Sequence, residues 1–262
     1  QYVEDGVPVA GSYEATCEEV GTIGNEYFGN LVNITFIQGI ATAVMSTTLV
    51  AARDEETDDE MRERYFDALT QKPFGGNIAD YRTKMMSMPG VGAVQVYPTW
   101  NGGGTVKLSI LDATHSPCSA EFITAMQKTV DPEDAYGQSG VGLGVAPIGH
   151  KVSVVTPDEV TISVSATVSF QKGHDAVQVK ARAEQALADY VQTLREEWDD
   201  TNESNEYSCD VFVARVSAVL ITVTGIANVS NVLLNGATND IYLTQNGQLQ
   251  QLPKLGEVIL NV

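Results

Sequence analysis

Residues 160–170 read Val-Thr-Ile-Ser-Val-Ser-Ala-Thr-Val-Ser-Phe, an uninterrupted alternation of apolar and mostly hydroxyl-bearing side chains. Successive side chains of a β-strand point to opposite faces of the sheet. The alternation therefore predicts a strand with one apolar and one polar face. Such a strand must pack its apolar face on another element.

A regular apolar stripe follows over residues 175–198. Its members recur at every third or fourth position, which places them on one side of a helix with charged residues opposite. The stripe consists of Val179, Ala183, Leu187, Val191, Leu194 and Trp198. We expect this helix, the longest in the chain, to pack on a sheet.

The C-terminal segment gives mixed signals. Residues 211–224 are apolar and contain β-branched side chains, yet the run is long for a strand. We expect a helix over 210–220 with extended chain after it. Short strands are predicted at 229–234, 240–243 and 257–262, separated by Asn-Gly turns.

A similar strand, strand and helix pattern precedes this region. Residues 94–97 and 106–110 alternate apolar with polar side chains on either side of the glycine-rich residues 101–104, which predicts a hairpin. Ser116-Pro117 provides a cap and a first-turn proline, so we expect a helix over 117–130. A further strand is predicted at 152–155.

Two shorter helices are expected between residues 57 and 88. Thr57 and Glu60 have the spacing of a capping box, which marks the first helix start, and Lys72-Pro73-Phe74-Gly75-Gly76 ends that helix. Asn77 is placed to cap the second helix, which ends at Pro89-Gly90. The apolar positions are Met61, Tyr65 and Leu69 in the first helix and Ile78, Tyr81, Met85 and Met88 in the second.

The whole pattern predicts an α+β protein. Residues 2–52 are rich in β-formers and glycine, so we expect an N-terminal β-rich domain over 1–56. A helical linker and a first two-layer α/β module should occupy 57–150. A second α/β module with the C-terminal strands should occupy 151–262.

Charge restricts the partners. The 262 residues include 34 acidic and 15 basic side chains, a net charge of -19. Such a charge repels nucleic acid phosphates and anionic membrane surfaces. No apolar run reaches the roughly 18 to 20 residues that a membrane helix needs. We therefore expect neither a nucleic acid nor a membrane as partner.

The cysteines indicate a reducing compartment. Cys17, Cys118 and Cys209 are far apart in the sequence, odd in number and without a Cys-x-x-Cys pair. Cys118, in the first turn of an expected helix, has the position of a thiol with a lowered pKa, although structural cysteines are commoner there. The chain starts at Gln1 without Met or a leader, so we expect a truncated or processed start.

The motifs that carry chemistry are incomplete. The loop at 137–149 is rich in glycine but lacks the Gly-Lys-Ser/Thr ending of a phosphate loop, and we interpret it as a flexible connection that orders against a partner subunit. His115, His150 and His174 form no ligand pair, and the acidic run at 54–60 lacks the spacing of a calcium loop. No Gly-x-Ser-x-Gly motif is present. We therefore predict no enzyme activity, no cofactor and no metal.

Several short motifs nevertheless occur in an order that is found in a known protein family. An acidic stretch followed by glycines comes first, then an acidic linker into an Arg-containing helix, then a helix running into Pro-Gly-Val and a strand. The segments are 18–25, 54–64, 76–96, 103–106, 146–149 and 252–258. Each alone is weak, but their order resembles the baseplate J-like family of contractile tails.

The resemblance implies a structural wedge subunit of a contractile phage tail or a phage-tail-like particle such as a tailocin. Its partners would be other wedge subunits, hub proteins and sheath-proximal tail proteins in a six-fold baseplate, with room for more than one copy per wedge. The protein would reside in the virion or particle after assembly, and in the host cytoplasm before it. Family members usually carry a further N-terminal segment, and we expect this chain to start after it.

Surfaces would then matter more than pockets. Acidic runs can fix the register of a charged neighbour, and an exposed strand edge can extend a neighbour's sheet. The candidate interface residues are Asp54, Glu55, Glu56, Gly142, Gly144, Glu196, Glu197, Glu257, Val258 and Leu260.

Two other functions compete with this one. A tail-associated cell-wall hydrolase needs a carboxylate pair or a zinc triad, and neither spacing is present. A carbohydrate-binding or adhesin module in residues 2–52 would need exposed aromatic side chains. The candidates there are Tyr2, Tyr13, Tyr27, Phe28 and Phe36.

Overall fold

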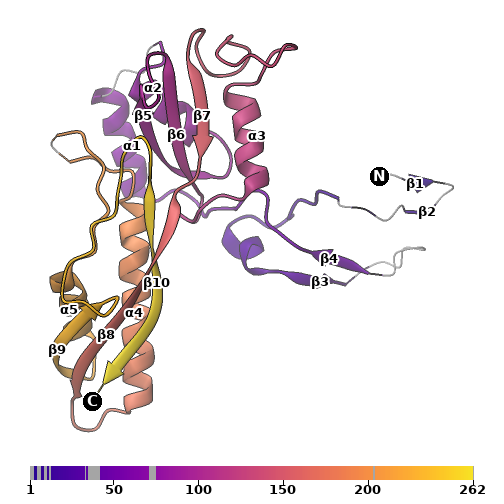
Figure 1. Ribbon diagram of the computed structural model, residues 1–262. Coiled ribbons are helices and arrows are strands. Elements are labelled where there is room, and N and C mark those ends of the chain that lie inside the picture. The colour runs from indigo at the N-terminus through magenta and orange to yellow at the C-terminus, as the bar shows by residue number, and fades with distance from the viewer. Residues whose placement is uncertain are drawn as a thin grey trace. The chain divides into compact units, whose positions relative to one another are not determined.

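The computed structural model describes residues 3–4, 7–8, 11, 13–32, 34, 42–70, 75–202 and 204–261 (Figure 1). By its internal contacts the chain divides into two units, Gln1–Gln71 and Lys72–Val262. Each unit is described by itself below.

The described residues of the first unit form short strands, a 3-10 helix and an α-helix. Antiparallel pairs join β1 (Val3–Glu4) to β2 (Val7–Pro8) and β3 (Gly29–Leu31) to β4 (Ala43–Met45). The 3-10 helix η1 covers Thr22–Glu26, and α1 covers Asp58–Thr70, where a helix was predicted. Residues 72–74, which belong to the segment predicted to end the first helix, and residues 33 and 35–41 of the predicted β-rich domain lie outside the described residues.

The second unit begins with a three-stranded sheet. Its elements are α2 (Ile78–Met86), β5 (Val91–Pro98), β6 (Thr105–Asp112), α3 (Ala120–Val130) and β7 (Lys151–Val155). The predicted hairpin is confirmed, since β5 and β6 pair antiparallel, and α3 carries the chain over to β7, which is parallel to β6. Alternate residues of β5 and β6 face α2 and α3, as period-2 strands require.

Side-chain caps set the starts of both helices. Asn77 accepts the amide of Asp80 at 2.8 Å, which confirms the predicted cap of α2. For α3 the expected start at Ser116-Pro117 is wrong. Ser119 caps the helix instead, accepting the amide of Phe122, because residues 112–116 fold into a turn around the Asp112 carboxylate.

A second three-stranded sheet follows. Its elements are β8 (Asp158–Phe170), α4 (Ala176–Glu196), α5 (Val213–Thr222), β9 (Ile226–Leu234) and β10 (Gln251–Asn261). The order is β10-β8-β9, with β10 parallel and β9 antiparallel to β8. Residues 240–243, expected as a strand, contribute only an isolated bridge between Ile241 and Val211.

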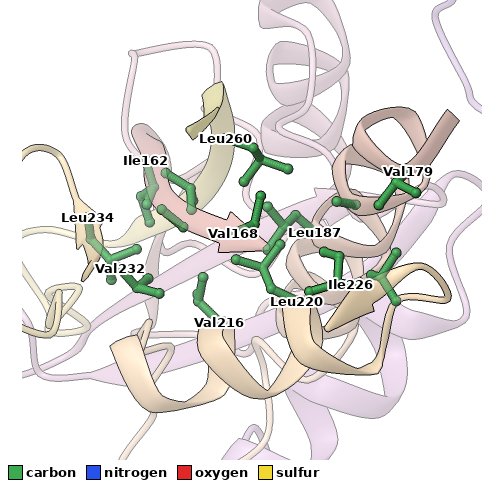
Figure 2. Close-up of a cluster of buried hydrophobic side chains, with 14 of the residues drawn as sticks. Ile162, Val168, Val179, Leu187, Val216, Leu220, Ile226, Val232, Leu234 and Leu260 are labelled. Carbon is green, nitrogen blue, oxygen red and sulfur yellow. The ribbon is translucent and has the colours of Figure 1, made fainter. Parts of the chain in front are cut away.

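The core of this second sheet matches the decisive sequence pattern. Ile162, Val164, Ala166 and Val168 of β8 are buried against the α4 stripe, whose Val179, Ala183 and Leu187 are at most 1% exposed. Figure 2 shows Ile162, Val168, Val179 and Leu187 converging with Val216 and Leu220 of α5. The prediction of an α+β fold is confirmed.

One strand lies in a different sheet from the one expected. Residues 151–155 were assigned to the second module, but β7 pairs with β6 from Thr105↔Lys151 to Ser109↔Val155. The strand therefore belongs to the first sheet. The two strand, strand and helix patterns read from the sequence do not correspond to two equal modules, because parallel pairing joins strands that the sequence separates by a helix.

Candidate assembly interface

The acidic segment 54–60 is partly engaged within its own unit. Asp54 accepts both the amide and the hydroxyl of Thr22, and Glu56 binds Arg64 through two bonds of 2.8 and 2.9 Å. The hydrogen bond from Arg64 lowers the pKa of the Glu56 carboxyl. Glu55 is exposed. The segment presents negative charge in a fixed arrangement rather than as a free tail.

Thr57 and Glu60 make reciprocal bonds at the start of α1. The Glu60 carboxylate accepts the Thr57 amide at 2.6 Å, and the Thr57 hydroxyl accepts the Glu60 amide at 3.3 Å. These bonds lower the pKa of the Glu60 carboxyl. Of the predicted apolar face of α1, Met61 and Tyr65 are exposed, while the Leu69 side chain lies outside the described residues.

Removing this capping pair should loosen the start of α1. The double change Thr57→Ala and Glu60→Ala is expected to lower the free energy of unfolding by about 1 to 2 kcal/mol, because two amides lose their partners. Chemical denaturation and limited proteolysis near residue 56 measure the effect. The exposed Glu55→Ala variant is the control, and equal behaviour of both variants would contradict the expectation.

Thr22 and Asn25 are structural residues that the sequence did not reveal. Asn25 makes a two-way clasp with the backbone of Ala52, at 2.6 and 2.8 Å, beside the Thr22 bonds to Asp54. The clasp joins residues about 30 positions apart. No spacing rule connects such a pair, so no sequence signal marked them.

The glycine-rich loop is held in place, contrary to its interpretation as a flexible connection. The Asp131 carboxylate, only 2% exposed, accepts the amides of Gly140 and Val152 at 2.8 and 2.9 Å. A side chain at Gly142 would collide with Ile148, and one at Gly144 with the end of α3. Both predicted interface glycines thus allow the loop to fold on itself.

The acidic end of α4 is divided between surface and interior. Glu196 and Glu197 are exposed, as expected. Asp199, by contrast, is buried and binds the Val94 amide and the Arg82 guanidinium at 3.2 and 3.1 Å. Burial raises the pKa of the Asp199 carboxyl above its usual value, and the positive charge of Arg82 offsets only part of this increase.

Trp198 joins the two sheets next to this pair. Its ring is fully buried with Ala93 and Leu111 of the first sheet and Leu252 of β10. The indole nitrogen donates to the Gln251 carbonyl at 3.1 Å, and the Trp198 carbonyl accepts from the buried Gln95 at 2.7 Å. The predicted stripe therefore ends two residues beyond α4, in a residue that contacts both sheets.

Side chains bind both edges of the first sheet in the second unit. Asp199 and Tyr207 bind the outer amides of β5, and Gln127 and Asp131 bind those of β7. The beginning of β10 is bound by Arg195 and Trp198. Among the described contacts, no side chain binds the outer edge of β10 beyond residue 254.

The predicted interface residues of β10 differ in exposure. Glu257 lies exposed at a bulge between Leu255 and Val258. Val258 packs partly against the core, and Leu260 is 5% exposed within it. The Leu260 side chain is therefore not free for a neighbour, and only the backbone edge remains available there.

The two buried cysteines, Cys118 and Cys209, have thiols that favour the protonated form. Burial raises the pKa of the Cys118 thiol to about 12 and that of Cys209 to about 12. The possibility of a lowered Cys118 pKa is therefore wrong. His150 accepts or donates a 2.8 Å bond with the Tyr81 hydroxyl and stacks on its ring, which is a packing role.

Stability should fall in alkaline solution. A thiol whose folded pKa is raised stabilises the protein fully below its unfolded pKa of about 8.5, and this contribution disappears as the pH rises towards 12. Denaturation at pH 8 to 11 should show a loss that approaches about 1.4 kcal/mol per pH unit for each thiol above pH 9, or about 2.7 kcal/mol per pH unit for the two together. The Cys118→Ala, Cys209→Ala variant should lose less, and an identical slope in both proteins would refute the assignment.

The described part of the chain contains no cluster of three or more His, Cys, Asp or Glu side chains suited to a metal ion. A shallow cavity of about 390 Å³ is lined mainly by apolar groups, among them Ile78, Val96, Pro98 and Val106. Within the same described residues, no helix has the length and apolar character to cross a membrane.

Comparison with protein families gives two matches. The baseplate J-like central domain matches residues 73–156, and the baseplate J-like protein C-terminal domain matches residues 162–261. The boundary between them falls between β7 and most of β8, where the first sheet gives way to the second. These matches support a structural role in a baseplate.

Individual relatives agree with this. The chain is 28% identical over 260 residues to the phage-like element PBSX protein XkdT of Bacillus subtilis (strain 168), covering 98% of this chain and 67% of XkdT. It is 26% identical over 171 residues to the protein JayE of Escherichia coli (strain K12), covering 63% of this chain and 62% of JayE.

A solved structure shows a weaker likeness. A chain of the anti-feeding prophage baseplate, determined by cryo-electron microscopy with six-fold symmetry, matches with a TM-score of 0.49 and 13% identity. The match covers 86% of this chain and 48% of that one.

Proposed function

The chain belongs to the baseplate J-like family, and we propose that it is a structural wedge subunit of the baseplate of a contractile phage tail or phage-tail-like particle. It would link the hub region to neighbouring wedge proteins and to the sheath, in a six-fold ring with room for more than one copy per wedge. The observation that carries the proposal is the succession of two baseplate J-like domains over residues 73–261.

The contacts between these two domains are suited to a subunit that transmits force. Trp198 and Asp199 follow α4 of the second sheet and bind β5 and its neighbours in the first. A buried aromatic ring combined with a buried ion pair resists relative movement of the two sheets. Such a joint supports a role in which force passes through the chain.

The acidic surface of the chain supports binding to partner proteins with basic surfaces. Over residues 1–71 acidic side chains outnumber basic ones 14 to 3. Asp54, Glu55 and Glu56 lie in this part, and Glu196 and Glu197 add a second acidic site in the other unit. We place hub or wedge partners with basic surfaces at these sites, where complementary charge would set register and association rate.

The uncovered end of β10 is the third contact that we propose. A neighbouring chain that adds a strand there would pair with backbone groups from Leu255 to Asn261 and pass the exposed Glu257. Side chains close the edges of β5 and β7, which makes the contrast with this edge informative. Val258 and Leu260 would hold the strand in place from the core side.

We keep the predicted three-part division as part of this proposal. Residues 1–56 would form the β-rich domain, 57–150 the linker and first α/β module, and 151–262 the second, with β7 contributed to the first sheet. The protein would remain in the host cytoplasm until assembly and in the baseplate afterwards. No catalytic step is assigned to it.

Deletion of the coding sequence in the strain that produces the particle tests the proposal. We expect tails without complete baseplates, and restoration by the full chain supplied in trans. Normal particles in the absence of the chain would contradict the proposal. Turnover of cell-wall material or binding to glycans by the purified chain would favour the hydrolase or adhesin alternatives.

A further inference from the structure

The loop between α3 and β7, residues 131–150, exposes an unusual amount of apolar surface. Tyr136 is 87% exposed, Leu143 63% and Ile148 83%. Among the described residues of the second unit, these are three of the five large apolar side chains that are more than 60% exposed. Figure 1 shows the loop projecting beyond the ends of α3 and β7. Concentrated exposure of this kind marks an interaction site.

The loop is folded before any partner arrives. Besides the bonds of Asp131, the Asp134 carboxylate accepts the amides of Tyr136 and Gln138, both at 2.8 Å. The Ala146 amide donates to the Val130 carbonyl at 2.9 Å, and Ala146 itself is 3% exposed. The loop is therefore attached to the core at its middle and at both ends.

Residues 141–148 form a closed excursion within the loop. The Gly149 amide donates to the Gly140 carbonyl at 2.8 Å, which joins the two ends. Gly142 and Ile148 approach so closely that a Cβ on Gly142 would lie 2.5 Å from the Ile148 side chain. Leu143 and Ile148 are thus displayed by a fixed backbone, which reduces the entropy that a partner must overcome on binding.

The apolar surface continues at the foot of the loop. Pro147 and His150, on either side of Ile148 in the sequence, contact Gly76, and His150 bonds Tyr81. Gly76 and Tyr81 line the shallow cavity of about 390 Å³ together with Ile78. A projecting apolar loop therefore stands beside a shallow apolar depression.

Charge indicates the kind of partner. Glu133 is exposed and lies beside Gly137, so the Tyr136 end of the loop is bordered by negative charge, whereas Lys151 lies at the base against Gly140. A second copy of a chain with net charge -19 would meet long-range repulsion. A basic protein would meet attraction.

We propose that the loop 131–150 is a preformed docking element for a different protein, whose contacting surface is apolar and carries Lys or Arg side chains around the site that receives Tyr136. This inference rests on the proposed function and names the chemistry of one partner. It assigns Gly142 and Gly144 to the folding of the loop, and the contact itself to Tyr136, Leu143 and Ile148.

Photo-crosslinking in assembled particles tests the proposal. A benzoylphenylalanine is introduced at position 136 or 148, and at position 242 as a control, because Tyr242 is 70% exposed outside the loop. We expect positions 136 and 148 to crosslink to the same non-self protein, through a peptide that contains apolar and basic residues, and position 242 not to reach it. Crosslinks only to copies of this chain, or none, would overturn the proposal.

A second variant keeps the test independent of crosslinking chemistry. The triple change Tyr136→Ser, Leu143→Ser and Ile148→Ser replaces exposed side chains, so the melting temperature should remain unchanged. Incorporation of the chain into particles should fall at least tenfold, and normal incorporation would overturn the proposal. If the wild-type chain is itself absent from particles, the proposed function fails as a whole; if it is present and the loop variant is incorporated normally, only the docking proposal fails.

Discussion

Trp198→Ala is expected to lower the free energy of unfolding by about 3 to 5 kcal/mol, the usual range for truncating a buried large aromatic side chain. The ring is fully buried between Ala93 and Leu111 of one sheet and Leu252 of the other, so the cavity would open at their junction. The Gln251 carbonyl would also lose the indole donor. Urea denaturation of the purified protein measures the loss.

Two controls make that result specific. Trp198→Phe keeps most of the apolar volume but removes the donor, so a loss of about 1 to 2 kcal/mol is expected. Tyr242→Ala truncates an exposed aromatic side chain and should change the free energy of unfolding by less than about 0.5 kcal/mol. A Trp198→Ala variant as stable as the Tyr242→Ala variant would contradict a joint built around this ring.

Asp199→Ala is expected to lower the free energy of unfolding by about 1 to 3 kcal/mol, for a different reason. The change leaves the Arg82 guanidinium without its carboxylate partner and the Val94 amide without an acceptor in the interior. The Asp199 side chain is buried while the Arg82 side chain is 28% exposed, so water can partly solvate the guanidinium that is left, and the unsatisfied Val94 amide accounts for much of the loss. Thermal or urea denaturation with Asp199→Ala checks this.

Asp199→Asn is the matched control. The amide has nearly the same shape and keeps an oxygen for the Val94 amide, while it removes the charge whose burial is unfavourable. We expect it to lose less than half as much stability as Asp199→Ala. Equal losses would show that the ion pair with Arg82, rather than the satisfied amide, dominates at this position.

Regular repeating patterns allowed much of the fold to be predicted. The alternation in β8 and the apolar stripe in α4 each indicate the type of element and the face that is buried. The apolar residues of both patterns lie in the core of the second sheet. Asn77 as the cap of α2 was equally readable, because capping depends on neighbours three positions away. Interactions between residues that are close in the sequence can therefore be predicted from the sequence.

Contacts between distant segments could not be read in the same way. The start of α3 moved from Ser116-Pro117 to Ser119 because the Asp112 carboxylate organises the preceding turn. The parallel placement of β7 beside β6 depends on how α3 packs, and no local pattern encodes it. Trp198 was recognised as part of a helix stripe, but its contacts with the first sheet follow only from the three-dimensional arrangement.

The candidate interface shows the same division. The sequence showed where acidic residues cluster. It did not show that Asp54 binds Thr22 and Glu56 binds Arg64 within the first unit. The sequence predicted Gly142 and Gly144 as interface residues because they lie in a glycine-rich loop. It did not predict Tyr136, Leu143 and Ile148, because exposure of an apolar side chain in a loop has no sequence signature. The fixed backbone that displays them depends on Asp131, nine positions from Gly140 and 21 from Val152.

Cryo-electron microscopy of the intact particle, at a resolution that separates β-strands, tests most directly whether this chain is a structural part of a baseplate. We expect density for both three-stranded sheets of residues 75–261 in every asymmetric unit of the ring, joined at Trp198 and in contact with neighbouring subunits. Complete baseplate density without these two sheets would contradict the assignment of the chain to the wedge.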